Sequence, residues 1–115
     1  MKTKYGWVEI DGIRYDHDVI VLLDRSVIKR SKKKSKKLKN IYGHTPLSEH
    51  EVEFLEAEEP EVVYIGTGQY GDLPVTKEAH AILNGFETVI RPTPEILELL
   101  EGENRPYVAF LHVTC

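Results

Sequence analysis

The hydrophobic pattern of the first thirty residues predicts β-strands. Apolar and polar residues alternate on both sides of Asp11-Gly12 in the stretch VEIDGIRY. Asp-Gly between alternating apolar residues is typical of a β-hairpin. The run DVIVLLD over 18–24 is apolar and rich in β-branched residues, which predicts a central strand, and 26–29 predicts a further short strand.

The second half of the chain alternates between helical and extended patterns. Ser48 and Glu51 have the spacing of a capping box, which predicts a helix that ends before Pro60. A second helix is predicted from a cap at Thr76 to Leu83, and a third from Thr93-Pro94 to a stop at Gly102. Strands are predicted around these helices, at 62–65, 87–91 and 107–113.

This order of elements predicts an α/β layer fold in a single globular domain over residues 1–115. No apolar stretch approaches the roughly 20 residues of a membrane span. The N-terminal residues include lysines but lack the continuous apolar segment of a signal peptide. We therefore expect a cytoplasmic protein without a membrane segment.

The formal net charge of −4 conceals a strong asymmetry along the chain. The stretch Lys29–Lys39 carries eight of the 15 basic residues and no acid, whereas Glu49–Glu61 carries seven glutamates and no Lys or Arg. We expect 29–39 to be a solvated basic loop that contacts the acidic helix or a partner protein. Lysine clusters also attract nucleic acid. We do not favour that alternative, because this stretch lacks interleaved aromatic residues and the rest of the chain is acidic.

The stretch IGTGQYG at 65–71 matches the G-x-G-x-x-G pattern of dinucleotide-binding turns. That fold begins a helix on the glycines and places an acidic residue at the end of the next strand. Here Pro74 and the cap at Thr76 move the helix away, and Arg91 stands where the acid belongs. We therefore predict that the glycines serve a tight loop with positive φ and close backbone approach.

A small anionic ligand near the same loop is an alternative. In open α/β sheets, ligands bind outside the carboxyl ends of strands. The loop Gly66–Gly71 follows the carboxyl end of one predicted strand, and Arg91 and Thr93 lie at the carboxyl end of another. Backbone amides and a guanidinium group there could hold an anion. The simpler alternative is that Arg91 pairs with one of the glutamates.

No catalytic or metal site can be assembled from residue spacing alone. The single cysteine, Cys115, excludes an intrachain disulfide, and it has only His112 as a nearby metal ligand. His112 is expected to be a hydrogen-bonded histidine of a strand, whereas His44 lies in a Gly-His-Thr-Pro loop. No Ser-His-Asp or Cys-His arrangement follows from the sequence. We expect no catalytic residue, metal or cofactor, and we lean towards a protein that is not an enzyme.

Five stretches in this order resemble a known family. They are YGWVEIDGIRYDHDVIV, YGHTPLS, VVYIGTGQYGDLPVT, RPTPEILELL and VAFLHVTC. The chain resembles a family of small domains of unknown biochemical function that includes the adipogenesis-associated domain protein and a mitochondrial assembly factor for respiratory complex I. Abundant Glu and Lys with few Gln, Asn, Cys and Met favour an archaeal or bacterial, thermophilic member.

The resemblance implies a three-layer α/β sandwich with a central mixed β-sheet, no established catalytic residue, no known cofactor, and function through protein partners. We therefore expect a non-enzymatic protein-interaction or assembly-type domain. Recurring family positions match Gly66, Thr67, Gly68, His44, Thr93 and Cys115. The predicted ligand-binding residues of the alternative function are Gly66, Thr67, Gly68, Tyr70, Arg91, Thr93 and His44.

Overall fold

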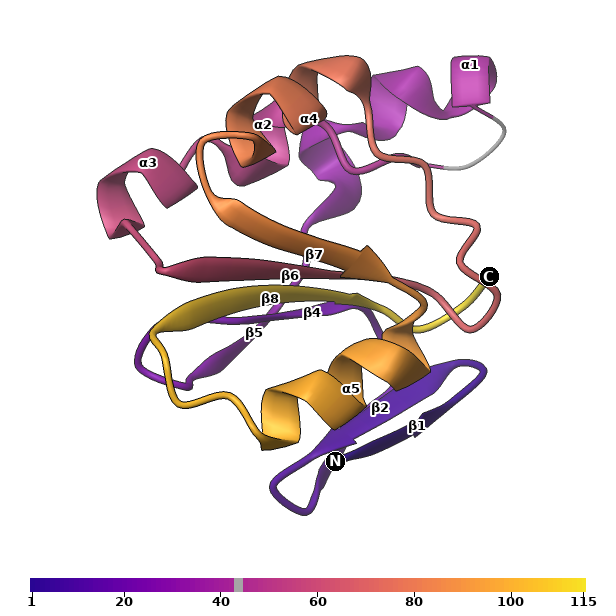
Figure 1. Cartoon of the computed structure of the whole chain (residues 1–115). Coiled ribbons are helices and arrows are strands. Elements are labelled where there is room, and N and C mark those ends of the chain that lie inside the picture. Colours follow the sequence, from indigo (N-terminus) through magenta and orange to yellow (C-terminus); the bar gives the residue numbers. More distant parts are fainter. Residues whose placement is uncertain (43–44) are drawn as a thin grey trace.

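A mixed sheet of five strands forms the centre of the molecule (Figure 1). The computed structural model describes residues 1–42 and 45–115, with the backbone alone at 40 and 41. The strands lie in the order β5 (Val27–Lys29), β4 (Val19–Val21), β8 (Tyr107–His112), β6 (Val62–Thr67) and β7 (Glu87–Arg91). Strand β6 is parallel to β7 and β8, whereas β4 is antiparallel to β5 and β8.

A second, smaller sheet precedes it in the chain. The antiparallel strands are β1 (Lys2–Lys4), β2 (Trp7–Ile10) and β3 (Ile13–Tyr15). The β2–β3 turn has φ angles of 50° at Asp11 and 82° at Gly12, so the predicted Asp-Gly hairpin is confirmed. The sequence did not predict β1, because its three residues, KTK, have no apolar alternation.

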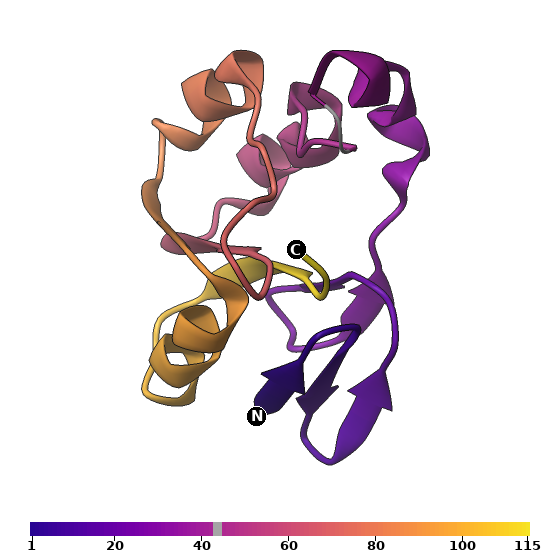
Figure 2. The same cartoon turned by 90° about the vertical axis from the view of Figure 1, so that its right-hand side faces the viewer.

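The helices and the small sheet cover the two faces of the central sheet. On one face lie α1 (Lys39–Tyr42), α2 (Glu49–Val52), α3 (Leu55–Glu58) and α4 (Lys77–Leu83). On the other face lie α5 (Thr93–Glu101) and the small sheet. In Figure 2 the C-terminal end of the chain, in yellow, lies between the upper helices and the indigo N-terminal strands. This arrangement confirms the predicted three-layer sandwich with a mixed central sheet.

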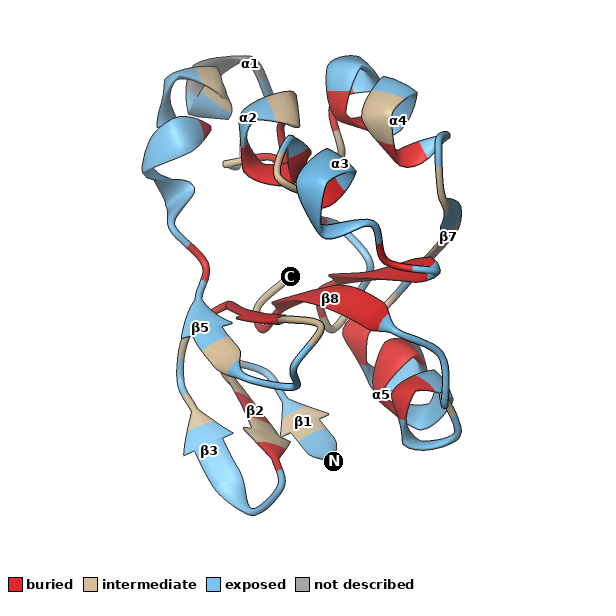
Figure 3. Cartoon of the chain, turned by 90° about the vertical axis from the view of Figure 1, so that its left-hand side faces the viewer, coloured by how far each residue is buried: buried red, intermediate tan, exposed pale blue. Residues whose placement is uncertain are grey.

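Two hydrophobic clusters fill the two sides of the sheet, and strand β8 divides its side chains between them. Tyr107, Ala109 and Leu111 belong to the cluster that includes α5 and the small sheet. Val108 and Phe110 belong to the cluster under α2, α3 and α4. All six residues of β6 and of β8 are buried, as Figure 3 shows in red. Burial on both faces explains why these strands read as continuous apolar runs.

Several predicted boundaries hold and others are wrong. Strand β7 spans the predicted residues, and the side chain of Thr76 accepts a hydrogen bond from the amide of Ala79 (3.1 Å) at the start of α4, as expected. The strand predicted over 18–24 ends at Val21, because a tight turn follows in which the amide of Leu22 donates to the carbonyl of Ser26 (2.9 Å).

The helix predicted from Ser48 to Pro60 is two short helices, α2 and α3, separated by a turn at 53–54. The predicted capping box is also wrong, because Ser48 makes no side-chain cap and its hydroxyl group lies 2.5 Å from that of Ser35. The carboxylate of Glu51 accepts from the guanidinium group of Arg30 instead (2.6 Å). Glu51, which the pattern assigned to the N-terminal cap of the helix, therefore pairs with the buried Arg30.

The start of α5 differs from its prediction in a related way. The predicted cap residue Thr93 is the first residue of the helix, and Pro92 occupies the cap position. The hydroxyl group of Thr93 accepts from the amide of Gly68 (2.9 Å) and donates to the carbonyl of His112 (2.7 Å). Thr93 therefore joins three segments of the chain, and the helix ends at Glu101 before Gly102 as predicted.

The glycine-rich stretch follows the geometry predicted for it. Gly66 lies inside β6, which continues two residues beyond the predicted strand, and a Cβ atom there would approach Thr93 Oγ1 to 2.8 Å. Gly68 and Gly71 have φ angles of 101° and 78°. A Cβ atom on Gly68 would overlap the backbone of Cys115 and lie 2.6 Å from the carbonyl oxygen of Thr114. Positive φ and close backbone approach are both confirmed at Gly68, whereas Gly71 shows the positive φ alone and Gly66 the close approach alone.

The amides of this loop bind the last residues of the chain. The amide of Gln69 donates to the backbone oxygen of Thr114 (2.7 Å), and those of Tyr70 and Asp72 donate to the backbone oxygen of Cys115 (3.3 and 3.0 Å). No helix begins on these glycines, since the next one, α4, starts at Lys77. The loop is a clamp for strand β8 and its extension, which agrees with the rejection of a dinucleotide turn.

This geometry predicts a large penalty for Gly68→Ala. Both Gly68 and Gly6 have positive φ, but a Cβ atom on Gly6 meets nothing within 4 Å. Gly6→Ala should therefore cost about 1–2 kcal/mol of backbone strain. Gly68→Ala should cost about 1–3 kcal/mol more through overlap with residues 114 and 115. Urea denaturation of both variants measures the difference, and equal losses would contradict the clamp.

Candidate functional site

A buried arginine holds together the polar centre of the molecule. The side chain of Arg30 follows β5 and lies between two acidic side chains, those of Asp18 and Glu51; all three residues are at most 5% exposed. Its Nη1 atom donates to Asp18 Oδ2 (2.9 Å), while Nε and Nη2 donate to the two oxygens of Glu51 (2.6 and 2.9 Å). Nη2 also donates to the carbonyl of Pro46 (3.1 Å). Such bidentate pairing orients the planar guanidinium group tightly.

We call Asp18, Arg30 and Glu51 the ion cluster, and residues 29–39 the basic segment. The hydroxyl group of Ser35 donates to Glu51 Oε2 (2.6 Å), so a second residue of the basic segment reaches the cluster. Among the described residues, every buried side-chain nitrogen and oxygen has a hydrogen-bond partner. The cluster therefore fixes the basic segment to α2 on one side and to Asp18, the residue before β4, on the other.

Asp18 also reaches the end of β8. Its Oδ1 atom accepts from the amide of Val113 (2.9 Å), and its Oδ2 atom lies 2.7 Å from His112 Nδ1. Burial by itself would raise the pKa of Asp18, but the hydrogen bond and charge of His112, the Val113 amide and the charge of Lys32 hold that pKa well below its usual range. The carboxylate is therefore ionised and acts only as an acceptor.

The other nitrogen of His112 faces a hydroxyl group. Nε2 of the ring lies 3.1 Å from Thr114 Oγ1. This satisfies both ring nitrogens, which confirms the expected hydrogen-bonded histidine. Its partner Asp18 could not be predicted from a local pattern, because the two residues lie 94 positions apart.

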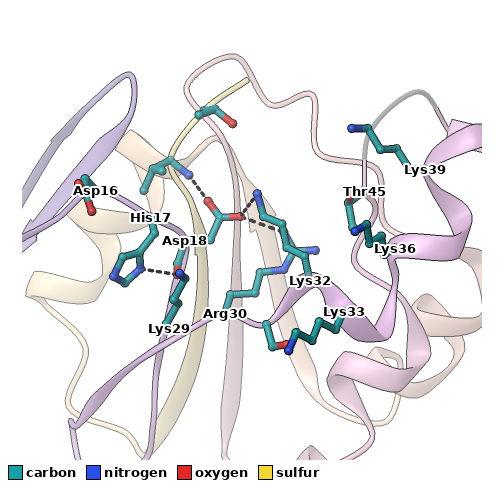
Figure 4. Close-up of a pocket in the computed structure, with 13 residues that line it drawn as sticks. Asp16, His17, Asp18, Lys29, Arg30, Lys32, Lys33, Lys36, Lys39 and Thr45 are labelled. Atoms are coloured by element: carbon teal, nitrogen blue, oxygen red, sulfur yellow. Dashed lines mark hydrogen bonds and ion pairs between the residues drawn. The ribbon is translucent and has the colours of Figure 1, made fainter.

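A cleft of about 830 Å³ opens beside the ion cluster (Figure 4). It is lined by six cationic side chains, which come from the basic segment, and by two carboxylates. Lys32 reaches Asp18 Oδ2 across 3.6 Å and is half exposed. The lining residues are Asp16, His17, Asp18, Lys29, Arg30, Ser31, Lys32, Lys33, Lys36, Lys39, Thr45, Val113 and Thr114.

Four of the lining lysines have no acidic partner among the described residues. None of the ion pairs found between residues 1–42 and 45–115 involves Lys29, Lys33, Lys36 or Lys39. The chain as a whole has a formal net charge of −4. An otherwise acidic molecule thus concentrates positive charge at this cleft.

The basic segment differs from the simple loop expected from the sequence. It forms two 3₁₀ turns, η1 (Lys32–Lys34) and η2 (Lys36–Leu38), and then enters α1. The expected contact between the basic and acidic stretches is confirmed by Arg30 and Glu51. That contact depends on one buried arginine, whereas five of the seven lysines of the segment line the cleft.

The residues predicted for the ligand site lie elsewhere. Gly66, Thr67 and Gly68 lie in or just after β6, and Thr93 is buried behind them. Tyr70 is 71% exposed and its ring centroid lies 6.3 Å from that of Tyr5. His44 lies outside the described residues. None of the described members of this predicted set lines the basic cleft.

Arg91, the cation of that predicted site, is exposed at the end of β7. Its Nη1 atom donates to the carbonyl of Ile90 (2.7 Å). Among the ion pairs of the described part of the chain, none contains Arg91, so the simpler alternative, a pairing of Arg91 with a glutamate, is wrong. A ligand role for the glycine loop stays a prediction.

The fold and the cleft together define a small three-layer α/β domain with a cationic cleft at one end of its sheet. No protein-family model and no curated protein matches the chain significantly. Solved structures do match. The crystal structure of conserved hypothetical protein PH1505 from Pyrococcus horikoshii OT3 has 31% identity and a TM-score of 0.86, with 100% of this chain and 98% of that one covered.

Two further structures extend this comparison. MT938 has 28% identity and a TM-score of 0.75, with 100% and 96% of the two chains covered. A Bordetella pertussis protein described as an Mth938-like domain has 20% identity and a TM-score of 0.53 over 95% and 81%, and so shares the fold. The chain belongs to the same family as the Pyrococcus horikoshii protein. Within the described residues, no helix has the length and apolar character needed to cross a membrane.

The ion cluster predicts a strong effect of Arg30→Met. Removing the cation leaves the carboxylates of Asp18 and Glu51 buried without their shared partner, which should cost about 3–5 kcal/mol of unfolding free energy. Arg91→Met is the matched control, because Arg91 is exposed, and it should change stability by less than about 0.5 kcal/mol. Urea denaturation compares the two, and a small loss for Arg30→Met would contradict the structural role of the cluster.

The lowered pKa of Asp18 predicts a loss of stability in acid. Its folded pKa lies below the ordinary 3.8, so its contribution is complete above that value and is lost as the pH falls through the folded pKa. Urea midpoints between about pH 6 and about pH 2.5 should therefore fall more steeply for the wild type than for Asp18→Asn. Parallel curves for the two proteins would show that Asp18 is not held ionised by folding.

Proposed function

We propose that this protein binds a small polyanionic ligand, of the phosphorylated class, in the basic cleft. The observation that supports this proposal is the set of four lysines, Lys29, Lys33, Lys36 and Lys39, that line one cleft without acidic partners in the described part of the chain. Neighbouring ammonium groups repel one another, and an anion among them removes that repulsion. Lysine is a common phosphate-binding residue because it supplies a compact point charge.

The size of the cleft supports a small ligand. Its volume of about 830 Å³ lies in the range of small-molecule sites, roughly 300–1,000 Å³. The site is also held in place before any ligand arrives, since Arg30 and Ser35 fasten the basic segment to Glu51. A fastened segment loses less entropy on binding, which favours affinity.

Nucleic acid is less well supported by the same residues. Strand-binding grooves stack bases on aromatic side chains, and among the described lining residues only His17 has an aromatic ring. Function through protein partners, which the family resemblance implies, stays a prediction and is compatible with ligand binding. The remaining alternative, an anion at the glycine loop 66–71, concerns a different place in the molecule.

Inorganic pyrophosphate is a suitable probe for the cleft. Titration calorimetry should detect saturable binding that weakens as salt is added, because exposed charges are screened. Reversing two cleft charges, with Lys33→Glu and Lys36→Glu, should weaken the affinity at least about tenfold, which is about 1.4 kcal/mol. At 100 times its Kd, the probe should stabilise the wild type by about 2.7 kcal/mol.

The matched control carries Lys4→Glu and Lys77→Glu, which change the net charge equally on residues outside the cleft. The control should retain wild-type affinity. Equal weakening in both double variants would mean that only the overall charge matters. That result, or no saturable binding by the wild type, would refute a specific site.

A further inference from the structure

We infer that the basic cleft also carries a nucleophile, Thr114, activated by His112 and Asp18. The chemistry we assign is acyl transfer from a substrate whose acyl group is joined to a phosphate-bearing leaving group. This inference rests on the proposed function, since the cleft lysines would hold the phosphate. It also reverses the expectation, drawn from residue spacing, that the chain has no catalytic arrangement.

The three side chains form an unbroken chain of contacts. Asp18 Oδ2 lies 2.7 Å from His112 Nδ1, and His112 Nε2 lies 3.1 Å from Thr114 Oγ1. These distances suit hydrogen bonds, and the order carboxylate, imidazole, hydroxyl is that of the catalytic triads of acyl transferases and hydrolases. Triads of this kind are recognised by their geometry and are built on unrelated folds.

The charge on Asp18 fixes the direction of these hydrogen bonds. An ionised carboxylate cannot donate, so the hydrogen between Asp18 and His112 belongs to Nδ1. In the neutral ring Nε2 is then the acceptor, and the hydroxyl group of Thr114 donates to it. His112 is thereby placed as the general base for Thr114. Asp18 is a positioning residue that keeps the ring in this tautomer.

The surroundings of Asp18 suit that role. Arg30 Nη1 lies 2.9 Å and Lys32 Nζ 3.6 Å from Oδ2, and the amide of Val113 donates to Oδ1. These donors stabilise the negative charge independently of His112, so Asp18 is ionised both beside a neutral imidazole ring and beside a protonated one. His112 is 8% exposed, whereas Thr114 is only partly buried and lines the cleft. The base is shielded from water, and the residue that carries the nucleophile lines the ligand space.

The lysines decide which leaving group fits. Thr114 and the four lysines line the same cleft, so a substrate can place its phosphate among ammonium groups and its acyl carbon at the hydroxyl oxygen. Positive charge near the leaving group favours the departure of an anion. An acyl phosphate is the simplest molecule with this combination.

The proposed step balances without a further reactant. Thr114 Oγ1 attacks the acyl carbon as its proton passes to His112 Nε2; the new C–O bond forms and the C–O bond to phosphate breaks. The imidazolium ion returns the proton to the departing phosphate. Water then attacks the acyl-threonine ester with His112 again as base, which releases the carboxylic acid and restores the hydroxyl group.

Acetyl phosphate tests this inference directly. Incubated with the full chain and quenched with acid during turnover, it should leave one acetyl group on Thr114, detected by mass spectrometry of the C-terminal peptide. Lysines react with acetyl phosphate without catalysis, but they form amides. Treatment with hydroxylamine removes an ester and leaves those amides intact, so the two products are separable.

Three variants sharpen the result. Thr114→Val, which keeps the branched shape, should form no hydroxylamine-labile product, and Thr114→Ser should form it again. His112→Asn keeps a donor for Asp18 but has no Nε2, and should slow acetylation by about 10²–10⁴-fold. Circular dichroism verifies that each variant is folded. Wild-type labelling that persists unchanged in His112→Asn would overturn the role of the histidine.

Pyrophosphate titration of the same preparation separates the two proposals. Binding of pyrophosphate without any ester on Thr114 would refute the nucleophile and leave the anion site standing. Absence of both would refute the anion site as well. Labelling of Thr114 that pyrophosphate inhibits competitively would support both proposals together.

Discussion

The pairing of Arg30 with two buried carboxylates is the interaction on which the rest of the structure depends. Each of these charges would be costly to bury alone. Together they satisfy one another, because the guanidinium group supplies donors to both acids. Through Asp18, the residue before β4, the cluster reaches His112 at the end of β8, and through Glu51 it reaches α2. A lysine-rich segment, which would otherwise extend into solvent, is thereby fixed beside the sheet.

The position of that segment explains why charge accumulates at one place. Five of its seven lysines lie around the buried Arg30 at one cleft, which also includes Val113 and Thr114 just beyond β8. The same arginine keeps Asp18 ionised next to His112, which links the electrostatics of the cleft to the proposed proton acceptor. Asp18 therefore has two roles, since it pairs with the buried Arg30 and positions His112. The glycine loop supports this arrangement from the other side, since its amides bind residues 114 and 115.

Local patterns predicted most of the fold. Neighbouring residues were enough to predict the Asp11-Gly12 hairpin, the cap at Thr76 and the buried strands. The residues after the glycine-rich stretch do not fit a dinucleotide-binding turn, and this predicted a tight loop there. Ser48 and Glu51 matched a capping box, but Ser48 pairs with Ser35 and Glu51 pairs with the buried Arg30, which lies 21 positions before it. The contact between Asp18 and His112 spans 94 positions. Local sequence patterns cannot predict such pairs, because the two residues become neighbours only when the whole chain has folded.

Backbone NMR during titration with inorganic pyrophosphate tests the central claim most directly, because it locates the anion without any substitution. The account predicts saturable amide shifts concentrated in the basic segment, residues 29–39, and at Val113 and Thr114. Shifts concentrated instead at 66–71 and 91–93 would place the anion at the glycine loop and contradict the account. Uniform, unsaturable shifts would contradict any specific anion site.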